Sequence, residues 1–338
     1  MPGNATPELN LRFETRPSKP AVFRFTERLI AEALARSGLA DVQTSLGEDL
    51  RDLSWLIDAD GLITSNDIVR DPRFPICELA VAAPRLRWIH IIGAGIEPLL
   101  PLDWLPEGTV LTNNSGVHAE KIREAAMMAL LMLNARIPAI VTNQTQARWD
   151  QIFTSCIAGK TVLVIGVGEM GGTIAAAAQT LGLRVIGVRR SGAPHPHVDR
   201  MVPIAALDAV LPDADFVVLA APLTPETRNL LDRRRIAMMK RGAGLLNVGR
   251  AGLVDHEALV VALQIGALSG AILDVHDPEP LPKSSPLWRA ANLVLTPHVT
   301  SDDLEGYLPK TFDLVFANAT RLMRGERLVN TVDPVRGY

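Results

Sequence analysis

The sequence has few cysteines, little net charge and no long apolar run, and each shortage excludes a class of protein. Cys77 and Cys156 are the only cysteines in 338 residues, and they are too far apart to suggest a disulfide framework or a metal site. A net charge of −3 gives no reason to expect nucleic acid or an anionic membrane as a partner. Residues 1–10 lack the apolar core of a signal peptide, and the apolar run 125–133 is too short to span a membrane. We therefore expect a globular, cytoplasmic protein.

The strongest positive signal is a glycine-rich turn between a strand and a helix. Residues 161–165 predict a strand, Gly166-x-Gly168-x-x-Gly171 follows, and residues 173–181 predict a helix that stops at Gly182. In this setting the first glycine makes a tight turn, the second lets the backbone approach a pyrophosphate, and the third lets the helix pack on the strand. The helix N-terminus offers N–H groups and a positive dipole end to phosphates. The pattern predicts a dinucleotide-binding domain.

Short strands alternate with helices along the rest of the chain, which predicts parallel sheets with helices on their faces. Strands at 8–15, 61–64 and 86–92, with a helix capped by Thr26 and ending at Gly38, predict a first small α/β domain. Strands at 216–220, 243–248, 271–274 and 293–295, each preceded by a helical stretch, predict one doubly wound domain from 160 to about 299. An amphipathic helix between Asp302 and Gly325 comes after that domain is complete, so we expect it to return to the first domain.

Polar side chains follow successive strands of the predicted doubly wound domain, where ligands of such sheets bind. They are Arg189, Thr224, Arg250, Asp274 with Glu279, and His298. In the first domain Gly93-Ala94-Gly95 follows a strand, which suits a backbone that approaches a ligand closely, although a plain tight turn explains it as well. His195 and His197 lie in a polar loop that we interpret as solvated, and His118 and His276 receive no role.

Together these segments resemble the D-isomer-specific 2-hydroxyacid dehydrogenases over nearly the whole chain. The resemblance is carried by the glycine turn and by Pro222-Leu223-Thr224-Pro225-Glu226-Thr227-Arg228, Asn247-Val248-Gly249-Arg250, Leu273-Asp274-Val275, Glu279-Pro280-Leu281 and Thr296-Pro297-His298. Ala251 and residues 299–302 depart from the family's usual pattern. The segment from Asp302 and the ending 332–338 are more similar to glyoxylate/hydroxypyruvate reductases than to phosphoglycerate dehydrogenases, and we expect no added regulatory domain.

The resemblance implies an α/β fold of two Rossmann-like, doubly wound parallel-sheet domains. The dinucleotide-binding domain, 116–302, would be inserted into a flavodoxin-like substrate domain made of 1–115 and 303–338, and residues 118–155 with Trp149 would form the arm of a homodimer. The implied catalytic residues are Arg250, Glu279 and His298, the implied substrate-binding residues are Gly93, Ala94, Gly95, Arg250 and His298, and no metal is expected. The implied cofactor residues are Gly166, Gly168, Glu169, Met170, Gly171, Arg189, Arg190, Ser191, Pro222, Leu223, Thr227, Val248, Gly249, Arg250, Asp274 and His298.

Reduction of a small 2-keto acid to a D-2-hydroxy acid requires a hydride donor, a cation for the carboxylate and a proton donor for the ketone oxygen. NAD(P)H supplies the hydride, and the guanidinium of Arg250 can bind a carboxylate through two hydrogen bonds. Backbone N–H groups of Ala94 and Gly95 could bind the same carboxylate. His298 suits the role of general acid, with Glu279 to orient it and favour its charged form. By resemblance, Asp274 would hold the nicotinamide carboxamide.

The residues after the second strand of the dinucleotide domain predict the cofactor. NAD-dependent domains carry an acidic residue there, about 20 residues after the glycine motif, whereas this sequence has Arg189-Arg190-Ser191. Two guanidinium groups favour a 2′-phosphate, so we expect a preference for NADP(H), with NAD(H) as the alternative.

Two other functions occur on the fold that this resemblance implies. A formate dehydrogenase is excluded, because its pattern requires glutamine where Glu279 stands. A dinucleotide-sensing, corepressor-like binding protein remains an alternative, although no added interaction tail is evident in the sequence. The substrate itself depends on loops around Trp55, Asn66 and Ile96, whose arrangement the sequence does not determine.

Overall fold

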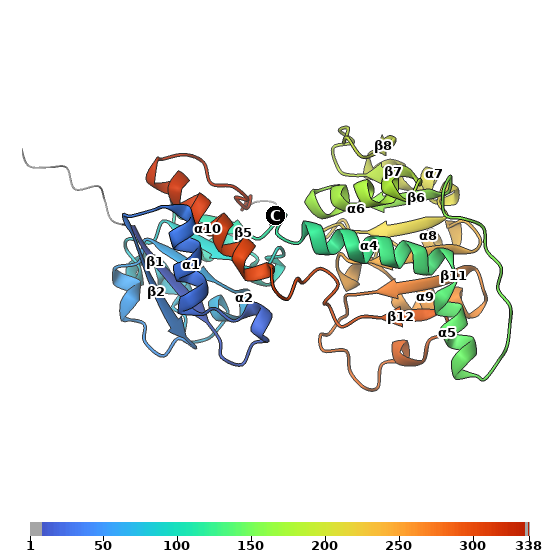
Figure 1. The fold of residues 1–338 in the computed structure, drawn as a ribbon, viewed down its shortest axis with the longest axis horizontal. Coiled ribbons are helices and arrows are strands. Elements are labelled where there is room, and N and C mark those ends of the chain that lie inside the picture. The colour runs from blue at the N-terminus through green and yellow to red at the C-terminus, as the bar shows by residue number, and fades with distance from the viewer. Residues whose placement is uncertain (1–8, 335–336, 338) are drawn as a thin grey trace, which may run out of the picture. The chain divides into compact units, whose positions relative to one another are not determined.

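The chain folds into two compact units, each built around its own sheet (Figure 1). A computed structural model describes residues 9–334 and 337, so the ending 332–338 lies partly outside the described residues. Unit 1 combines the chain up to His118 with the chain from Asp303 onward, and unit 2 is Ala119–Asp302. Among the described residues no single helix is long and apolar enough to cross a membrane, and only the bent pair Ala119–Asn134 and Ile137–Thr145 meets the test of length and composition.

Unit 1 contains a five-stranded parallel sheet with the flavodoxin-like order β2-β1-β3-β4-β5. The helices α1 and α10 lie side by side against this sheet (Figure 1), and Phe312 of α10 meets Phe13 of β1 edge to face at 5.3 Å. The elements are β1 (Leu9–Thr15), α1 (Glu27–Ser37), β2 (Val42–Glu48), β3 (Gly61–Thr64), α2 (Asn66–Val69), α3 (Leu79–Ala82), β4 (Trp88–Ile91), β5 (Val110–Asn113) and α10 (Tyr307–Met323).

The two longest helices of unit 1, α1 and α10, begin, end and pack as their sequences predict. The Thr26 side chain accepts a hydrogen bond from the Leu29 N–H and caps α1, and Gly38 ends it at φ +68°. The predicted apolar stripe of α10 is buried at Leu308, Phe312, Val315, Phe316 and Ala319. This stripe packs with the N-terminal strands, so the prediction that the last helix returns to the first part of the chain is confirmed.

Unit 2 contains a seven-stranded parallel sheet with the order β12-β11-β10-β9-β6-β7-β8. The order reverses between β6 and β9, as in Rossmann domains, and an apolar core lies on each face of the sheet. The elements are α4 (Ala119–Asn134), α5 (Ile137–Thr145), β6 (Thr161–Ile165), α6 (Glu169–Thr180), β7 (Arg184–Val188), β8 (Arg200–Val202), α7 (Leu207–Val210), β9 (Phe216–Leu219), α8 (Arg233–Met238), β10 (Ala243–Asn247), α9 (His256–Gln264), β11 (Leu268–Leu273) and β12 (Leu293–Leu295).

The structure corrects the sequence predictions in three details. Strands β2, β5 and β8 were not predicted. Helix α6 begins at Glu169 rather than at residue 173, because the backbone continues as helix through two glycines that the pattern assigned to the turn. Strand β12 follows a short 3-10 helix, Pro286–Arg289, rather than an α-helix.

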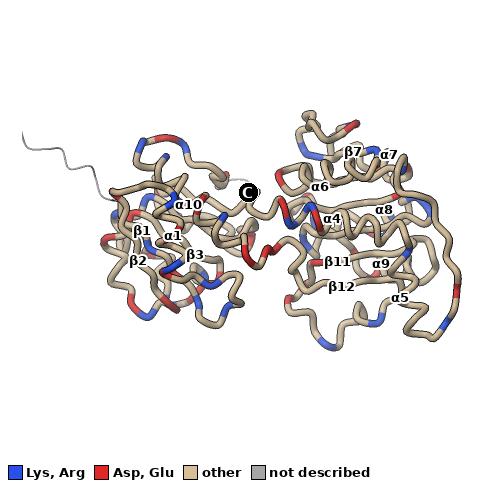
Figure 2. The backbone as a smooth tube through the Cα atoms, viewed as in Figure 1, with Lys and Arg blue, Asp and Glu red and all other residues tan. Residues whose placement is uncertain are grey.

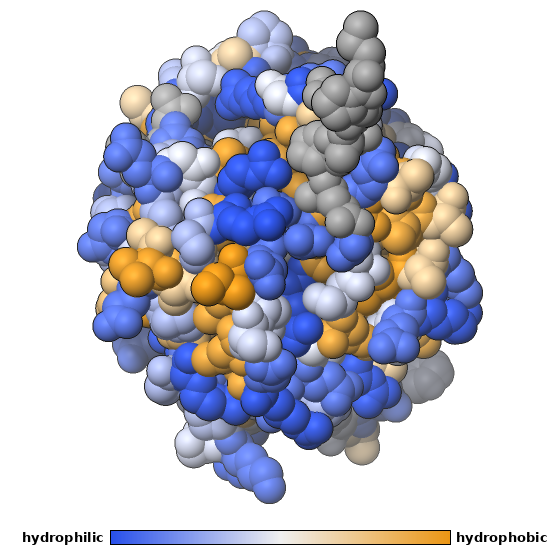
Figure 3. All heavy atoms as spheres, turned by 90° about the vertical axis from the view of Figure 1, so that its left-hand side faces the viewer, coloured by the Kyte–Doolittle hydropathy of each residue, from blue (hydrophilic) through white to orange (hydrophobic). Residues whose placement is uncertain are grey.

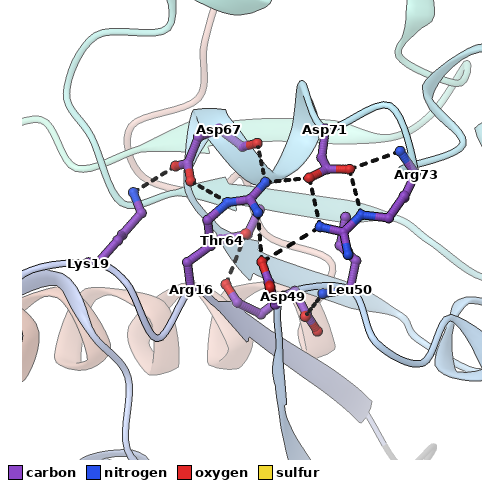
Figure 4. Close-up of polar contacts among 9 residues, drawn as sticks. Arg16, Lys19, Asp49, Leu50, Thr64, Asp67, Asp71 and Arg73 are labelled. Atoms are coloured by element: carbon purple, nitrogen blue, oxygen red, sulfur yellow. Dashed lines mark hydrogen bonds and ion pairs between the residues drawn. The ribbon is translucent and has the colours of Figure 1, made fainter.

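A network of charged side chains ties together the carboxyl ends of β1, β2 and β3 in unit 1 (Figure 4). The Arg16 guanidinium pairs with Asp49, Asp67 and Asp71 at 2.6–2.8 Å, and Arg73 also pairs with Asp71. Hydrogen bonds from Arg73 and Arg16 hold the pKa of Asp71 well below its ordinary value. Because Asp67 is the second residue of α2, this network fixes the start of that helix.

Basic and acidic residues are interspersed over both units (Figure 2), in keeping with the small net charge. The face of unit 1 in Figure 3 mixes hydrophilic side chains with areas of apolar ones. In unit 2 exposed apolar side chains lie close together along the chain, and they belong to α4, α5 and the irregular segment that follows: Met128, Leu131, Ile140, Val141, Trp149 and Phe153.

Candidate active site

The sheet of unit 2 brings the predicted site residues of that unit to one edge. Parallel strands end at the same edge, and β12, β11, β10, β9, β6 and β7 are consecutive neighbours in the sheet. The segments that carry His298, Glu279, Arg250, Thr227, Gly166 and Arg189 therefore follow one another along this edge. Ligands of doubly wound sheets bind at this edge, beside the reversal of strand order.

The glycines after β6 have the separate roles that the sequence predicts. Gly166 adopts φ +95°, and a Cβ atom there would lie 2.4 Å from the Ala221 nitrogen. A Cβ atom at Gly171 would lie 2.0 Å from the Gly166 oxygen, so only glycine allows the helix to pack on the turn. At Gly168 a Cβ atom would meet nothing within 4 Å. The first and third glycines are thus required by packing, whereas the second leaves open space.

The first turn of α6 fits the phosphates of a dinucleotide. Gly168 is its N-cap residue, and no side chain caps the helix. The N–H groups of the first turn are therefore available, together with the positive end of the helix dipole, beside the open space over Gly168.

The Pro222–Thr227 turn after β9 is closed by one buried hydroxyl. The Thr227 hydroxyl donates to the Pro222 carbonyl at 2.7 Å and accepts from the Thr224 N–H at 2.7 Å. Leu223 packs against Gly252, where a Cβ atom would lie 3.0 Å from its methyl group. Thr227 thus fixes the predicted cofactor loop from within.

Arg189, at the end of β7, is half-buried and partly bound by its own loop. One terminal nitrogen donates to the Pro194 carbonyl at 2.8 Å, whereas Nε is buried and has no partner among the residues that the structure describes. Arg190 is exposed.

His195 is half-buried rather than fully solvated, because its ring lies against the first turn of α6. A Cβ atom at Gly172 would approach its Nε2 to 2.6 Å. Burial, and then the charges of His197 and Arg189, lower the pKa of His195. This contact explains why a fourth glycine follows the motif, whereas His197 is exposed as expected.

Arg250 follows β10 in a turn built by Asn247. The Asn247 side chain donates to the Arg250 carbonyl at 2.9 Å and accepts from the Gly249 N–H at 3.1 Å. Asn247 is fully buried and Arg250 is half-buried, so the asparagine holds the turn while the guanidinium lies nearer the surface.

His298 and Glu279 form the hydrogen-bonded pair that the sequence predicts. His298 Nδ1 lies 2.8 Å from Glu279 Oε2, and the two side chains are 44% and 38% exposed. Partial burial alone would raise the pKa of Glu279, but hydrogen bonds from the His298 ring and the His276 N–H outweigh burial and lower it. Glu279 is therefore a carboxylate at neutral pH, positioned to orient the imidazole and to stabilise its protonated form.

Asp274 holds the segment that carries His298. This buried carboxylate accepts hydrogen bonds from the hydroxyls of Thr296 and Thr300 at 2.7 Å and from the N–H groups of Val299 and Thr300 at 3.1–3.3 Å. A contact of Asp274 with the nicotinamide carboxamide stays a prediction.

In unit 1 all three carbonyls of the turn Gly93-Ala94-Gly95 accept hydrogen bonds, and these bonds hold the backbone of the turn in place. Asn66 donates to the Gly95 oxygen at 2.9 Å, Asn113 to the Ala94 oxygen at 2.8 Å, and the Asn114 N–H to the Gly93 oxygen at 3.2 Å. Within the described residues, the N–H groups of Ala94 and Gly95 donate no hydrogen bond. Adjacent N–H groups of this kind bind anions.

The sequence pointed to the loop of Asn66 but not to Asn113 or Asn114, because an isolated asparagine carries no distinctive pattern. It also placed Ile96 at the substrate loops, whereas Ile96 is 1% exposed and belongs to the core of unit 1. Trp55 is half-buried, with Arg12 stacked over its ring at 5.3 Å.

The fold and this edge define the class of protein. An uncapped helix after a glycine turn, at the reversal point of a doubly wound sheet, defines a dinucleotide-binding unit, and the acid–base pair beside it indicates an oxidoreductase.

Comparison with known proteins gives the family. Residues 127–300 match the family model described as D-isomer specific 2-hydroxyacid dehydrogenase, NAD binding domain. Glyoxylate reductase from Thermofilum pendens is 30% identical over 260 residues, which are 74% of this chain and 75% of that protein. The chain belongs to the D-isomer specific 2-hydroxyacid dehydrogenase family and is an NAD(P)-dependent oxidoreductase that binds a dinucleotide and a 2-keto acid.

Solved structures agree over nearly the whole chain. The D-isomer specific 2-hydroxyacid dehydrogenase of Xanthobacter autotrophicus Py2, in complex with NADPH and MES, is 28% identical with a TM-score of 0.82, over 99% of this chain and 100% of that chain. The NADPH-dependent glyoxylate/hydroxypyruvate reductase of Sinorhizobium meliloti, in complex with NADP and sulfate, is 26% identical with a TM-score of 0.78, over 98% and 100%. By contrast, the match covers 53–56% of the length of the D-3-phosphoglycerate dehydrogenases.

Proposed function

We propose that this enzyme reduces a small 2-keto acid, such as glyoxylate or hydroxypyruvate, to the D-2-hydroxy acid with NADPH. The observation that carries the proposal is the His298–Glu279 pair, 2.8 Å apart at the edge of the sheet that also holds the glycine turn and Arg250. The names of similar proteins support this substrate class, because they include glyoxylate reductases and a glyoxylate/hydroxypyruvate reductase.

Each residue has a part in the proposed reaction. NADPH supplies the hydride when it is bound. The Arg250 guanidinium binds the substrate carboxylate and polarises the ketone oxygen, and the N–H groups of Ala94 and Gly95 bind the carboxylate. The His298 imidazolium donates its proton to the ketone oxygen, and Glu279 stabilises the imidazolium before that transfer. Unit 2 is thus the proposed dinucleotide-binding domain and unit 1 the substrate domain.

The preference for NADPH is proposed from Arg189, Arg190 and Ser191. Within residues 9–334 and 337, the buried Nε of Arg189 has no partner, and it lies at the strand end where the 2′ position of the adenosine ribose binds in this fold. The complexes of similar proteins with NADPH and NADP support this preference. We expect Arg189→Ala to raise the KM for NADPH about tenfold with little effect on NADH, whereas Arg184→Ala, at the other end of β7, leaves both unchanged. A higher kcat/KM with NADH than with NADPH in the wild type contradicts the preference.

A panel of 2-keto acids assayed with NADPH and NADH tests the function. We expect NADPH oxidation with glyoxylate or hydroxypyruvate and formation of the D-isomer where the product is chiral. Dinucleotide binding without turnover of any 2-keto acid contradicts the proposal and favours the alternative, a dinucleotide-sensing, corepressor-like binding protein.

The exposed apolar side chains of α4, α5 and the following segment support a homodimer formed by residues 118–155. Trp149 and Phe153 are 92% and 87% exposed, and large apolar side chains exposed to this extent so close together along the chain are typical of an interface. A two-fold interface would cover them with the same surface of a second copy. We expect a dimeric mass by light scattering at micromolar concentration, and Trp149→Asp to weaken it. A monomeric wild type contradicts the assignment.

Cys77 and Cys156 are exposed and unpaired, which suits the cytoplasmic location we propose.

A further inference from the structure

His276 binds both strands of the edge that carries the acid–base pair. It follows β11, and its backbone N–H donates to Glu279 Oε1 at 2.8 Å. Its ring Nε2 lies 2.8 Å from the Thr296 carbonyl oxygen, which follows β12. Glu279 Oε2 lies 2.8 Å from His298 Nδ1. His276 thus holds the Glu279 carboxylate through its backbone N–H and the segment that carries His298 through its ring.

The Thr296 carbonyl is the junction of this network. It accepts the hydrogen bond from the His276 ring and also one from the N–H of His298, at 3.0 Å. His298 adopts φ +54°, a left-handed conformation that costs free energy for a residue other than glycine. Such a conformation persists only where surrounding contacts determine it. The His276 bond is the side-chain contact that fixes the carbonyl two residues before His298.

The hydrogen position on His276 follows from its partner. A carbonyl oxygen can only accept, so Nε2 carries the hydrogen of the bond to Thr296. Among the described residues, the other ring nitrogen, Nδ1, is buried without a partner, and so is Nε2 of the neighbouring His256. The His276 ring therefore acts on this edge as a donor, through Nε2.

We propose that His276 is a positioning residue for catalysis: its ring N–H fixes the Thr296 carbonyl and so holds His298 in hydrogen-bonding distance of Glu279. This inference rests on the proposed role of His298 as the general acid, and it assigns a role to a side chain that the sequence left without one.

Four variants separate the ring donor from the ring's bulk. His276→Phe keeps the ring and removes the donor, and His276→Gln keeps an N–H donor of similar reach. His276→Asn keeps the amide but is too short by one methylene. His256→Phe is the matched control, since it removes a buried ring nitrogen that has no hydrogen bond to the catalytic segment.

We expect His276→Phe and His276→Asn to lower kcat for reduction about fivefold to tenfold, the effect of one lost hydrogen bond. The alkaline limb of their kcat/KM profile should move to lower pH, because the histidine is then less firmly held by Glu279. His276→Gln and His256→Phe should retain the wild-type kcat and profile. Affinity for NADPH should be unchanged in all four variants. If His276→Phe does not fold, the inference is tested by the difference in kcat and pH profile between His276→Gln and His276→Asn.

Hydrogen exchange of the peptide that covers residues 296–300 gives a readout that does not depend on turnover. The N–H groups of His298, Val299 and Thr300 are bound within this network, so exchange should accelerate in the Phe and Asn variants only. Unchanged kcat, pH profile and exchange in both variants overturn the inference. So does an equal change in His256→Phe, which would show a loss of packing rather than of positioning.

The outcomes also separate this inference from the proposed function. If the wild type turns over no 2-keto acid, the proposed function fails, whereas accelerated exchange in the Phe and Asn variants would still show that His276 holds the segment. If the wild type is active and His298→Ala is not, but the His276 variants behave as wild type throughout, the inference alone fails.

Discussion

The two sheets of this enzyme present functional groups at their carboxyl edges in different ways. In unit 1 the groups are backbone N–H donors of the Gly93–Gly95 turn, shaped by Asn66 and Asn113. In unit 2 they are side chains, Arg250 and His298 with Glu279, on turns that buried polar residues hold in place. Both edges therefore depend on a supporting layer of hydrogen bonds, and only the outermost groups differ in kind.

This difference determines what can be read from the sequence. A histidine, arginine or glutamate is itself a distinctive residue at a strand end, so the residues proposed for catalysis in unit 2 could be picked out by position. A backbone N–H is carried by every residue except proline, so the unit 1 turn offered two glycines and nothing more. The supporting residues on both edges, such as Asn113 and His276, were not identified from the sequence.

The largest expected effect comes from removing the side-chain acid of unit 2. His298→Ala should lower kcat/KM for reduction at every pH by about 10²–10⁴, the usual contribution of a general acid. His197→Ala, which removes an exposed histidine of the same unit, is the control and should change little. Steady-state assays with NADPH measure kcat/KM for both variants. A decrease of less than about tenfold in His298→Ala would mean that another group donates the proton.

The next largest expected effect is on stability, and it comes from the buried side chain of His90 in unit 1. His90 is fully buried between Thr112 and Asn114, with ring nitrogens 2.8 and 3.0 Å from their side-chain oxygens. Burial, opposed by the Asn114 hydrogen bond, lowers the pKa of His90 to about 4. The folded state then binds fewer protons than the unfolded state between that value and the ordinary pKa of about 6.5.

The contribution of His90 to the free energy of unfolding is therefore fully present above pH ~6.5. It is lost as the pH falls toward ~4, and the loss reaches up to about 3 kcal/mol. Chemical unfolding of the wild type and of His90→Gln at several pH values measures this loss. The variant is expected to be less stable at pH 7 but to have a flatter pH dependence over the same window. Equal slopes for the two proteins would show that His90 is not held neutral.

A smaller effect is expected at the unit 1 turn. Asn113→Ala removes the donor to the Ala94 carbonyl, and the loosened turn should raise the KM for the 2-keto acid roughly tenfold while kcat changes less. Asn10→Ala, which removes an exposed asparagine bond to Asp58 of the same unit, should leave KM unchanged. An unchanged KM in Asn113→Ala would indicate that the backbone of the turn does not bind the carboxylate.

Much of the fold followed from local patterns, and the exceptions have physical causes. The glycine motif, the Thr26 cap and the stripe of α10 are short-range signals, and each gave the correct element. Strand β2 alternates exposed and half-buried residues, and β8 is three residues long, so neither carries the apolar run by which buried strands are recognised. His195 was misassigned because its contact with Gly172 joins residues of different elements, which composition alone does not reveal.

The central claim is that Glu279 sustains the charged form of His298, and a pH profile of kcat/KM for reduction tests it most directly. Glu279→Gln keeps the shape of the side chain and removes its charge, so the 2.8 Å contact can persist without the electrostatic support. Reduction requires the imidazolium, so activity should be full at low pH and fall as the pH rises. In Glu279→Gln the alkaline limb should lie at lower pH than in the wild type. A limb that stays in place or moves to higher pH would contradict the account.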